Sequence, residues 1–160
     1  MNPQDHEKTS GVVFPPPLYY LIGILAGFGL AWLYPVRLIP AGFESAARVV
    51  GIALAVLAVA LAASALMDFK RAGTSPVPLR PTTALVTRGP YRFTRNPMYL
   101  AFALVGFALA LYFGSLWVAI GNVLAMLCVD RLVIAKEEPY LEEKFGDAYL
   151  DYKKRVRRWL

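Results

Sequence analysis

The residues best suited to chemistry gather in one short stretch, "TRGPYRFTRNPMYL", at residues 87–100. A Gly-Pro pair within it predicts a turn, and Pro97 predicts the start of an apolar helix, because proline has no amide hydrogen to lose there. Arg95 and Asn96 would then lie at the N-terminal end of that helix, where unpaired backbone N–H groups and the helix dipole favour an anion. Asn96 can cap the helix, and Arg95 can bind a carboxylate through two hydrogen bonds.

Two tyrosines accompany these polar groups. Tyr91 flanks the predicted turn, and Tyr99 lies about one turn inside the predicted helix. Aromatic ring faces accept a cation or a flat base. Helix capping and membrane-interface positions explain each residue taken singly, but together they predict a site for a ligand with a carboxylate, a cation and an aromatic base. S-adenosylmethionine has all three, and its methyl transfer needs alignment and exclusion of water rather than a metal or a covalent catalyst.

A second group of charged residues follows the last apolar run: Asp130 and Arg131, then Lys136, Glu137 and Glu138. Charges that snorkel to the membrane interface are the ordinary explanation for such a group. As ligand-binding groups, the adjacent glutamates point about 100° apart on a helix, so at most one of them is expected to face a pocket squarely. A carboxylate there could accept hydrogen bonds from a ribose diol or attract a cation.

An unusually apolar chain must position these groups. Its 160 residues are 58% hydrophobic and 18% charged, which predicts an all-α, polytopic membrane protein rather than a soluble domain. Residues 1–14 are polar, lack the features of a signal peptide and are predicted to be a mobile tail. Residues 15–160 are predicted to form a single domain, whose N-terminal part, 15–67, contains helices at 18–34 and 46–67.

Glycines in the first apolar run form a G-x-x-x-G pattern at Gly23 and Gly27. No strand precedes them, so a phosphate-binding loop is not expected. The pattern predicts close packing between membrane helices.

The next apolar run carries no charge from Pro97 to Val129. As one helix it would be about 50 Å long, well beyond a bilayer core of about 30 Å. The sequence "FGS" at 113–115 predicts a break, which gives a hairpin of two short helices and about four membrane helices in all. Six Lys and Arg residues lie in 68–96 and eight follow Val129, so the positive-inside rule predicts that both termini and the site are cytoplasmic.

The tail 137–160 repeats apolar residues every three or four positions, with acidic residues early and basic residues late. This order complements a helix dipole and predicts an amphipathic interfacial helix on the membrane surface. Basic residues flank the apolar runs rather than covering one soluble face, which favours membrane lipids over nucleic acid as partners. The single Cys128 and the single His6 predict no metal site.

The segments "LVTRGPYRFTRNPMYL" and "EEPYLEEKFGDAYLDYKKRVRRWL" closely resemble the isoprenylcysteine carboxyl methyltransferase family and are similar to the related phospholipid N-methyltransferases. The resemblance covers residues 84–160, about half of the chain. It implies an integral membrane methyltransferase that takes S-adenosylmethionine from the cytoplasm and a lipophilic acceptor from the bilayer. That acceptor could be an isoprenylcysteine-like carboxylate, a lipid amine or a small thiol.

Site residues follow from this resemblance position by position. Known members have histidine where this chain has Asn96, and asparagine can hydrogen-bond a carboxylate but cannot serve as a general base. The catalytic candidates are Arg95, Asn96 and Arg131, the last as an arginine that binds the acceptor. The implied cofactor contacts are Ala84, Leu85, Val86, Thr87, Tyr91, Asn96, Pro97, Met98, Tyr99 and a glutamate of the pair Glu137 and Glu138.

Two other functions stay open at this point. Sterol reductases share a related C-terminal pocket, and in a membrane reductase Arg88 and Arg92 could bind the 2′-phosphate of NADPH. A non-enzymatic membrane subunit could instead use the basic tail to bind anionic lipid or a partner. In that case Tyr99→Phe or Asn96→Ala would leave function intact. The acceptor atom (O, N or S) and the oligomeric state also stay open.

Overall fold

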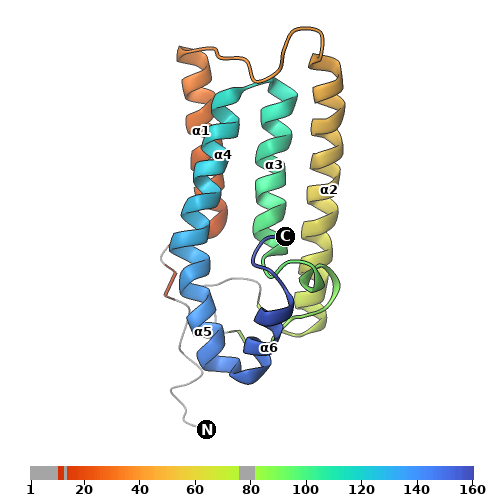
Figure 1. Ribbon diagram of the computed structural model, residues 1–160, viewed down its shortest axis with the longest axis vertical. Helices are drawn as coiled ribbons and strands as arrows, with labels where there is room; N and C mark the ends of the chain where they lie inside the picture. Colours follow the sequence, from red (N-terminus) through yellow and green to blue (C-terminus); the bar gives the residue numbers. More distant parts are fainter. Residues whose placement is uncertain (1–10, 13, 76–81) are drawn as a thin grey trace.

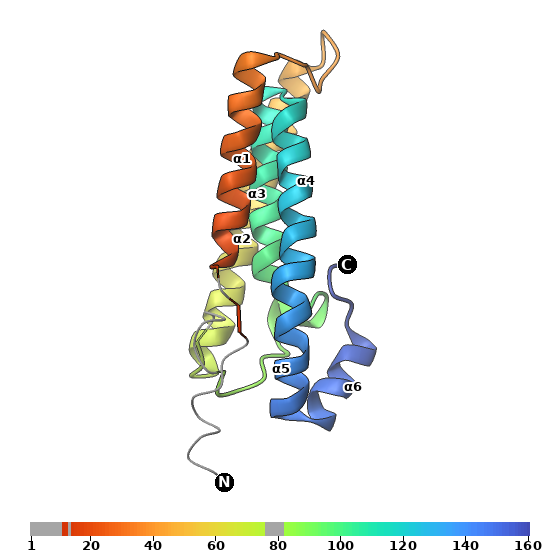
Figure 2. The same cartoon turned by 90° about the vertical axis from the view of Figure 1, so that its left-hand side faces the viewer.

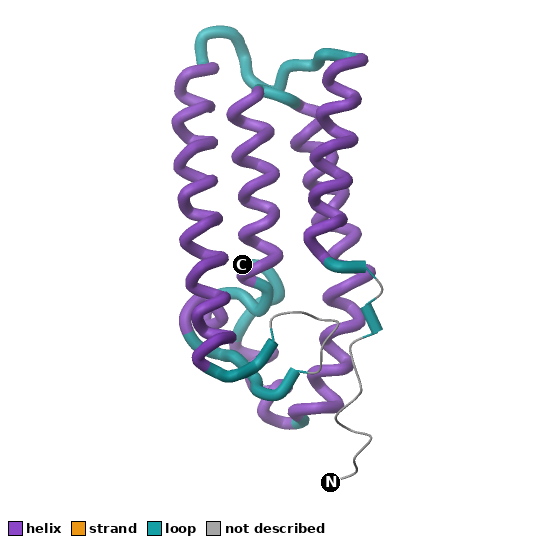
Figure 3. Tube along the Cα trace, turned by 180° about the vertical axis from the view of Figure 1, so that it is seen from behind, coloured by secondary structure: helices purple, strands orange, loops and turns teal. Residues whose placement is uncertain are grey.

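The computed structural model describes residues 11–12, 14–75 and 82–160. The mobile tail predicted at 1–14 lies mostly outside these residues. Apart from one isolated bridge between Arg37 and Ser115, the described residues form helices and loops without β-strands, as Figure 3 shows from behind. The all-α prediction is therefore confirmed for this part of the chain.

The helices α1 to α4 stand side by side and run alternately up and down (Figure 1). α1 packs chiefly on α4, and α2 packs on α3. The view in Figure 2 shows the chain continuing below the bundle into α5 and α6. The elements in order are α1 Pro16–Leu33, α2 Glu44–Arg71, the 3-10 turn η2 Gly89–Arg92, α3 Pro97–Phe113, α4 Leu116–Val129, the π-helical turn η3 Asp130–Ile134, α5 Ala135–Phe145 and α6 Asp147–Arg155.

Three helical runs in the described residues are long and apolar enough to cross a membrane: α1, α2 and the continuous run Leu116–Phe145. The remaining long helix, α3, is apolar but has 17 residues. These lengths support a membrane protein. Four crossings and a cytoplasmic site stay predictions.

The break predicted at 113–115 is confirmed. α3 ends at Phe113, and Gly114 follows with a φ of 62°, a left-handed conformation that glycine adopts without steric cost. Ser115 then caps α4, since its hydroxyl accepts a hydrogen bond of 3.3 Å from the backbone N–H of Val118.

Glycines bring α1 and α4 into close contact, as the G-x-x-x-G pattern predicts. A Cβ at Gly23 would collide with the backbone carbonyl of Gly121, and one at Gly27 would lie 2.7 Å from the Cα of Val118. Only a residue without a side chain allows this approach.

The tail differs from the single interfacial helix predicted at 137–160. Gly146, with a φ of 53°, separates α5 from α6 and turns the chain back toward the bundle. The apolar residues of the tail pack against one another and against Leu85 of the loop before η2. These residues are Leu141, Phe145, Tyr149, Tyr152 and Val156.

Candidate functional site

A cavity lies at the lower end of the bundle in Figure 1, where α3 begins and α4 runs into α5. Its walls come from the end of α2, the loop that follows it, η2, the start of α3, η3, α5 and α6. The structure therefore brings together residues as far apart in sequence as Phe69 and Tyr152. The predicted site residues on these walls are Ala84, Leu85, Val86, Tyr91, Arg95, Asn96, Met98, Tyr99, Glu137 and Glu138.

Three predicted site residues lie off the cavity wall. Thr87 is half-buried in the loop, and Pro97 is buried at the first position of α3. Arg131 is 80% exposed along its side chain, and its Nε lies 3.5 Å from Asp130. The buried face of η3 is occupied by Val133 and Ile134, so Arg131 falls on the opposite face and points away from the cavity.

Glu138 is the most heavily paired group in the site. Its carboxylate is buried and lies 2.9 Å from a guanidinium nitrogen of Arg95. Arg158 adds two hydrogen bonds to the same carboxylate, at 3.0 Å and 2.8 Å. The bond to Glu138 is the main cause that raises the pKa of Arg158 further above its ordinary value, so this guanidinium stays charged.

Glu137 lies on the same wall but in a different setting. The hydroxyl of Tyr99 donates a hydrogen bond of 2.7 Å to it. Within the described residues no cation lies within salt-bridge distance of Glu137, unlike Glu138. Both glutamates border the cavity, although at most one was expected to face it, because the cavity is wide enough to meet two adjacent positions of α5.

Asn96 and Arg95 do not act as the helix cap and free anion clamp that the sequence predicts. The side chain of Asn96 makes no cap bond to α3; its amide donates instead to the backbone carbonyl of Arg158, at 2.9 Å. One nitrogen of Arg95 contacts Glu138 and the hydroxyl of Tyr149, the latter at 3.3 Å. The Nε of Arg95 is buried and has no hydrogen-bond acceptor among the described residues, and a buried donor of this kind ordinarily has a partner.

Tyrosines form much of the remaining wall. Tyr91 is buried against Phe69, with ring centroids 5.5 Å apart in an edge-to-face arrangement. The hydroxyl of Tyr152 donates a hydrogen bond of 2.7 Å to the carbonyl of Tyr91. Burial raises the pKa of Tyr91, Tyr149 and Tyr152, so these phenols stay neutral near pH 7. Neutral aromatic walls suit a flat base or a cation.

The comparison with protein families agrees with this geometry. A family model described as phospholipid methyltransferase matches residues 46–148. The chain belongs to the phospholipid methyltransferase family. The matched range includes every wall of the cavity except the part contributed by α6. Membership implies methyltransferase activity and confirms the family resemblance drawn from the two motifs.

The chain is also similar to an uncharacterized protein of Haemophilus influenzae (strain ATCC 51907 / DSM 11121 / KW20 / Rd). It is 44% identical over 63 residues, which make up 39% of this chain and all of the relative. The shared segment is thus a minor part of this chain.

Several wall residues were missed by sequence reasoning. Tyr149 and Tyr152 belong to the apolar repeat of the tail, which predicts an interfacial helix, but both line the cavity. Phe69 follows the second apolar run and belongs to no motif. The three-residue spacing of the two tyrosines in the tail was the sequence signal that could have identified them. Groups of three or more potential metal ligands do not occur in the part of the chain that the structure describes.

Proposed function

We propose that the protein is an S-adenosylmethionine-dependent methyltransferase that acts on a lipophilic acceptor in the membrane. The observation that carries this proposal is the presence of two unlike carboxylates on one cavity wall. Glu138 is neutralised by Arg95 and Arg158, whereas Glu137 has Tyr99 as its partner and no cation among the described residues. A carboxylate in that setting attracts a cation such as the sulfonium of S-adenosylmethionine.

Other groups on the wall suit the rest of the cofactor. The Nε of Arg95, which has no partner among the described residues, is the proposed donor to the carboxylate at the amino-acid end of S-adenosylmethionine. The rings of Tyr91, Tyr149 and Tyr152 offer faces and edges to adenine. By contrast, Arg88 and Arg92 are exposed and lie off the described cavity wall. These arginines were the groups expected to bind the 2′-phosphate of NADPH, so their position favours S-adenosylmethionine.

In the proposed reaction, a lone pair on the acceptor oxygen, nitrogen or sulfur attacks the methyl carbon. The bond between carbon and the sulfonium sulfur breaks, and S-adenosylhomocysteine leaves with the electron pair. The contribution of the protein is alignment of the three atoms and exclusion of water. Asn96 serves this alignment through its hydrogen bond rather than as a base.

The acceptor is proposed to be lipophilic because the cavity has an apolar side next to the bundle. Phe69, Met98 and Ile134 line that side. Isoprenylcysteine-like carboxylates, lipid amines and small lipophilic thiols all fit this description. The proposed orientation, with the site in the cytoplasm, would let the cofactor enter from water and the acceptor from lipid.

Methyl transfer to membrane lipids tests the proposal. Purified protein in detergent is incubated with a lipid extract and S-adenosylmethionine that carries an isotopically labelled methyl group, and the products are analysed by mass spectrometry. The proposal predicts a labelled lipophilic product whose yield falls in Glu137→Gln when S-adenosylmethionine is limiting. The proposal would be refuted if the protein incorporated no more label than heat-inactivated protein does with any of a broad panel of lipid extracts and thiols.

A further inference from the structure

Residues 156–160, here called the strap, run along the start of α3. The backbone N–H of Arg95 donates to the carbonyl of Arg157 at 2.9 Å. The carbonyl of Arg158 accepts two further bonds, from the hydroxyl of Thr94 at 3.1 Å and from the amide of Asn96 at 2.9 Å. The main chain of the strap is therefore fixed to the α3 side of the cavity.

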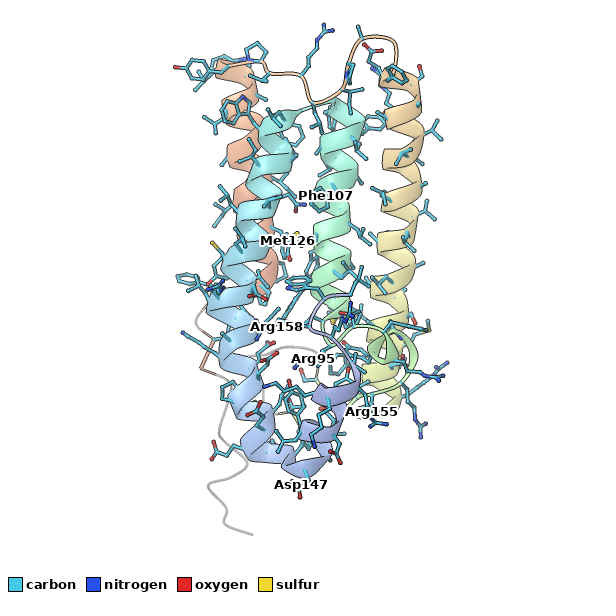
Figure 4. All side chains as sticks on the ribbon, viewed as in Figure 1. Arg95, Phe107, Met126, Asp147, Arg155 and Arg158 are labelled. Atoms are coloured by element: carbon cyan, nitrogen blue, oxygen red, sulfur yellow. The ribbon has the colours of Figure 1, made fainter. Side chains whose placement is uncertain are left out.

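The side chain of Arg158 reaches the opposite side. Its guanidinium hydrogen-bonds Glu138 of α5 at 2.8 Å and 3.0 Å, and both oxygens of Asp130 of η3 at 3.1 Å. Trp159 adds a bond of 3.0 Å to Asp130. Figure 4 shows Arg158 between α4 and the start of α3, with Arg95 just below it. One residue thus joins both sides of the cavity.

We propose that Arg158 is a positioning residue for the methyl transfer proposed above. It holds the carboxylate of Glu138 against Arg95 and fixes the start of α5 relative to the start of α3. This role rests on the proposed function, because the cavity that Arg158 shapes is the proposed cofactor site. Arg158 itself does not line the described cavity, so it acts through Glu138.

The charges explain why an arginine is needed. Without Arg158, Glu138 would keep Arg95 and the more distant Lys153, at 3.7 Å, whereas Asp130 would lose its bidentate partner. A planar guanidinium can bond two carboxylates at once in a fixed geometry, but a lysine ammonium is a single point charge. Arg158→Lys should therefore restore charge without restoring the full bridge.

The test compares Arg158→Gln and Arg158→Lys with the matched control Arg157→Gln. The side chain of Arg157 is exposed, and its backbone carbonyl bond survives the substitution. Affinity for S-adenosylhomocysteine is measured by titration calorimetry, and hydrogen–deuterium exchange of the ligand-free protein is followed in residues 135–145. Arg158→Gln should weaken binding about tenfold or more, because hydrogen bonds between charged groups are lost. Arg158→Lys should be intermediate, and the control should stay within about twofold of wild type.

Exchange data separate positioning from a general loss of stability. The proposal predicts faster exchange in α5 with unchanged protection in α1 and α2. If Arg158→Gln loses protection throughout the protein, Asp130→Asn is tested instead. This variant should also speed exchange in α5 alone, with a smaller loss of affinity. Affinity and α5 exchange equal to those of Arg157→Gln would overturn the proposal. Failure of the wild-type protein to bind would refute the proposed function instead, and α5 exchange would still decide whether Arg158 positions this helix.

Discussion

Replacement of Glu137 by glutamine should lower the affinity for S-adenosylmethionine much more than the affinity for S-adenosylhomocysteine. The two ligands differ by one methyl group and one positive charge on sulfur. Glutamine has nearly the shape of glutamate and can still accept the hydrogen bond from Tyr99. The substitution therefore removes the negative charge of this one carboxylate and changes little else.

The size of the effect follows from the setting of Glu137. Among the described residues no cation neutralises its charge, so most of that charge is available to a ligand. Two unit charges about 4 Å apart attract each other by about 4 kcal/mol at an effective dielectric constant of about 20. Any solvent and ions that reach the carboxylate screen part of this energy. We expect at least about 1.4 kcal/mol, which is about a tenfold change in the ratio of the two dissociation constants.

Titration calorimetry with both ligands at about pH 8, well above the ordinary carboxyl range, measures this ratio. Glu143→Gln, on the exposed side of the same helix, is the control and should leave the ratio unchanged. A misfolded site would weaken both ligands equally, so the ratio isolates the charge. An equal loss of affinity for both ligands in Glu137→Gln would refute the role of Glu137 as the sulfonium partner.

Three further predictions concern stability and the limits of the site. Tyr152→Phe removes the bond to the carbonyl of Tyr91 and should lower the free energy of unfolding by about 1–2 kcal/mol, measured by denaturant unfolding in detergent; no change would contradict that bond. Gly23→Ala should destabilise the protein by about 1–3 kcal/mol because its Cβ meets the backbone of α4, whereas Gly29→Ala, which has open space, should change stability by less than about 0.5 kcal/mol. Arg131→Ala should leave the affinity for S-adenosylhomocysteine within about twofold, since this side chain is exposed, and a larger calorimetric loss would place it in the site after all.

Local signals in the sequence predicted the helices and much of the cavity wall. Proline at position 97 and the glycine at position 114 act on the backbone of their own neighbours, so the start and end of α3 could be predicted from residue type. Tyr99 and the pair Glu137 and Glu138 could be predicted to lie near one another because the two helices of a hairpin begin and end at the same side.

Long-range contacts could not be predicted in this way. Asn96 has the residue type of a helix cap, but a backbone carbonyl 62 residues later takes its amide. The periodicity of the tail indicates an apolar face without indicating whether lipid or protein covers it. No residue type marks the π-helical turn η3, which shifts the register of the helix and leaves Arg131 on the exposed face. Arg158 gains its partners only once the strap lies against α3.

Binding of S-adenosylmethionine by the purified protein is the most direct test of the central claim. Titration calorimetry in detergent should give saturable heat with S-adenosylmethionine and with S-adenosylhomocysteine, and none with NADPH at concentrations up to about millimolar. The claim would be contradicted if neither S-adenosylmethionine nor S-adenosylhomocysteine gave heat or a thermal shift, or if NADPH bound more tightly than they do.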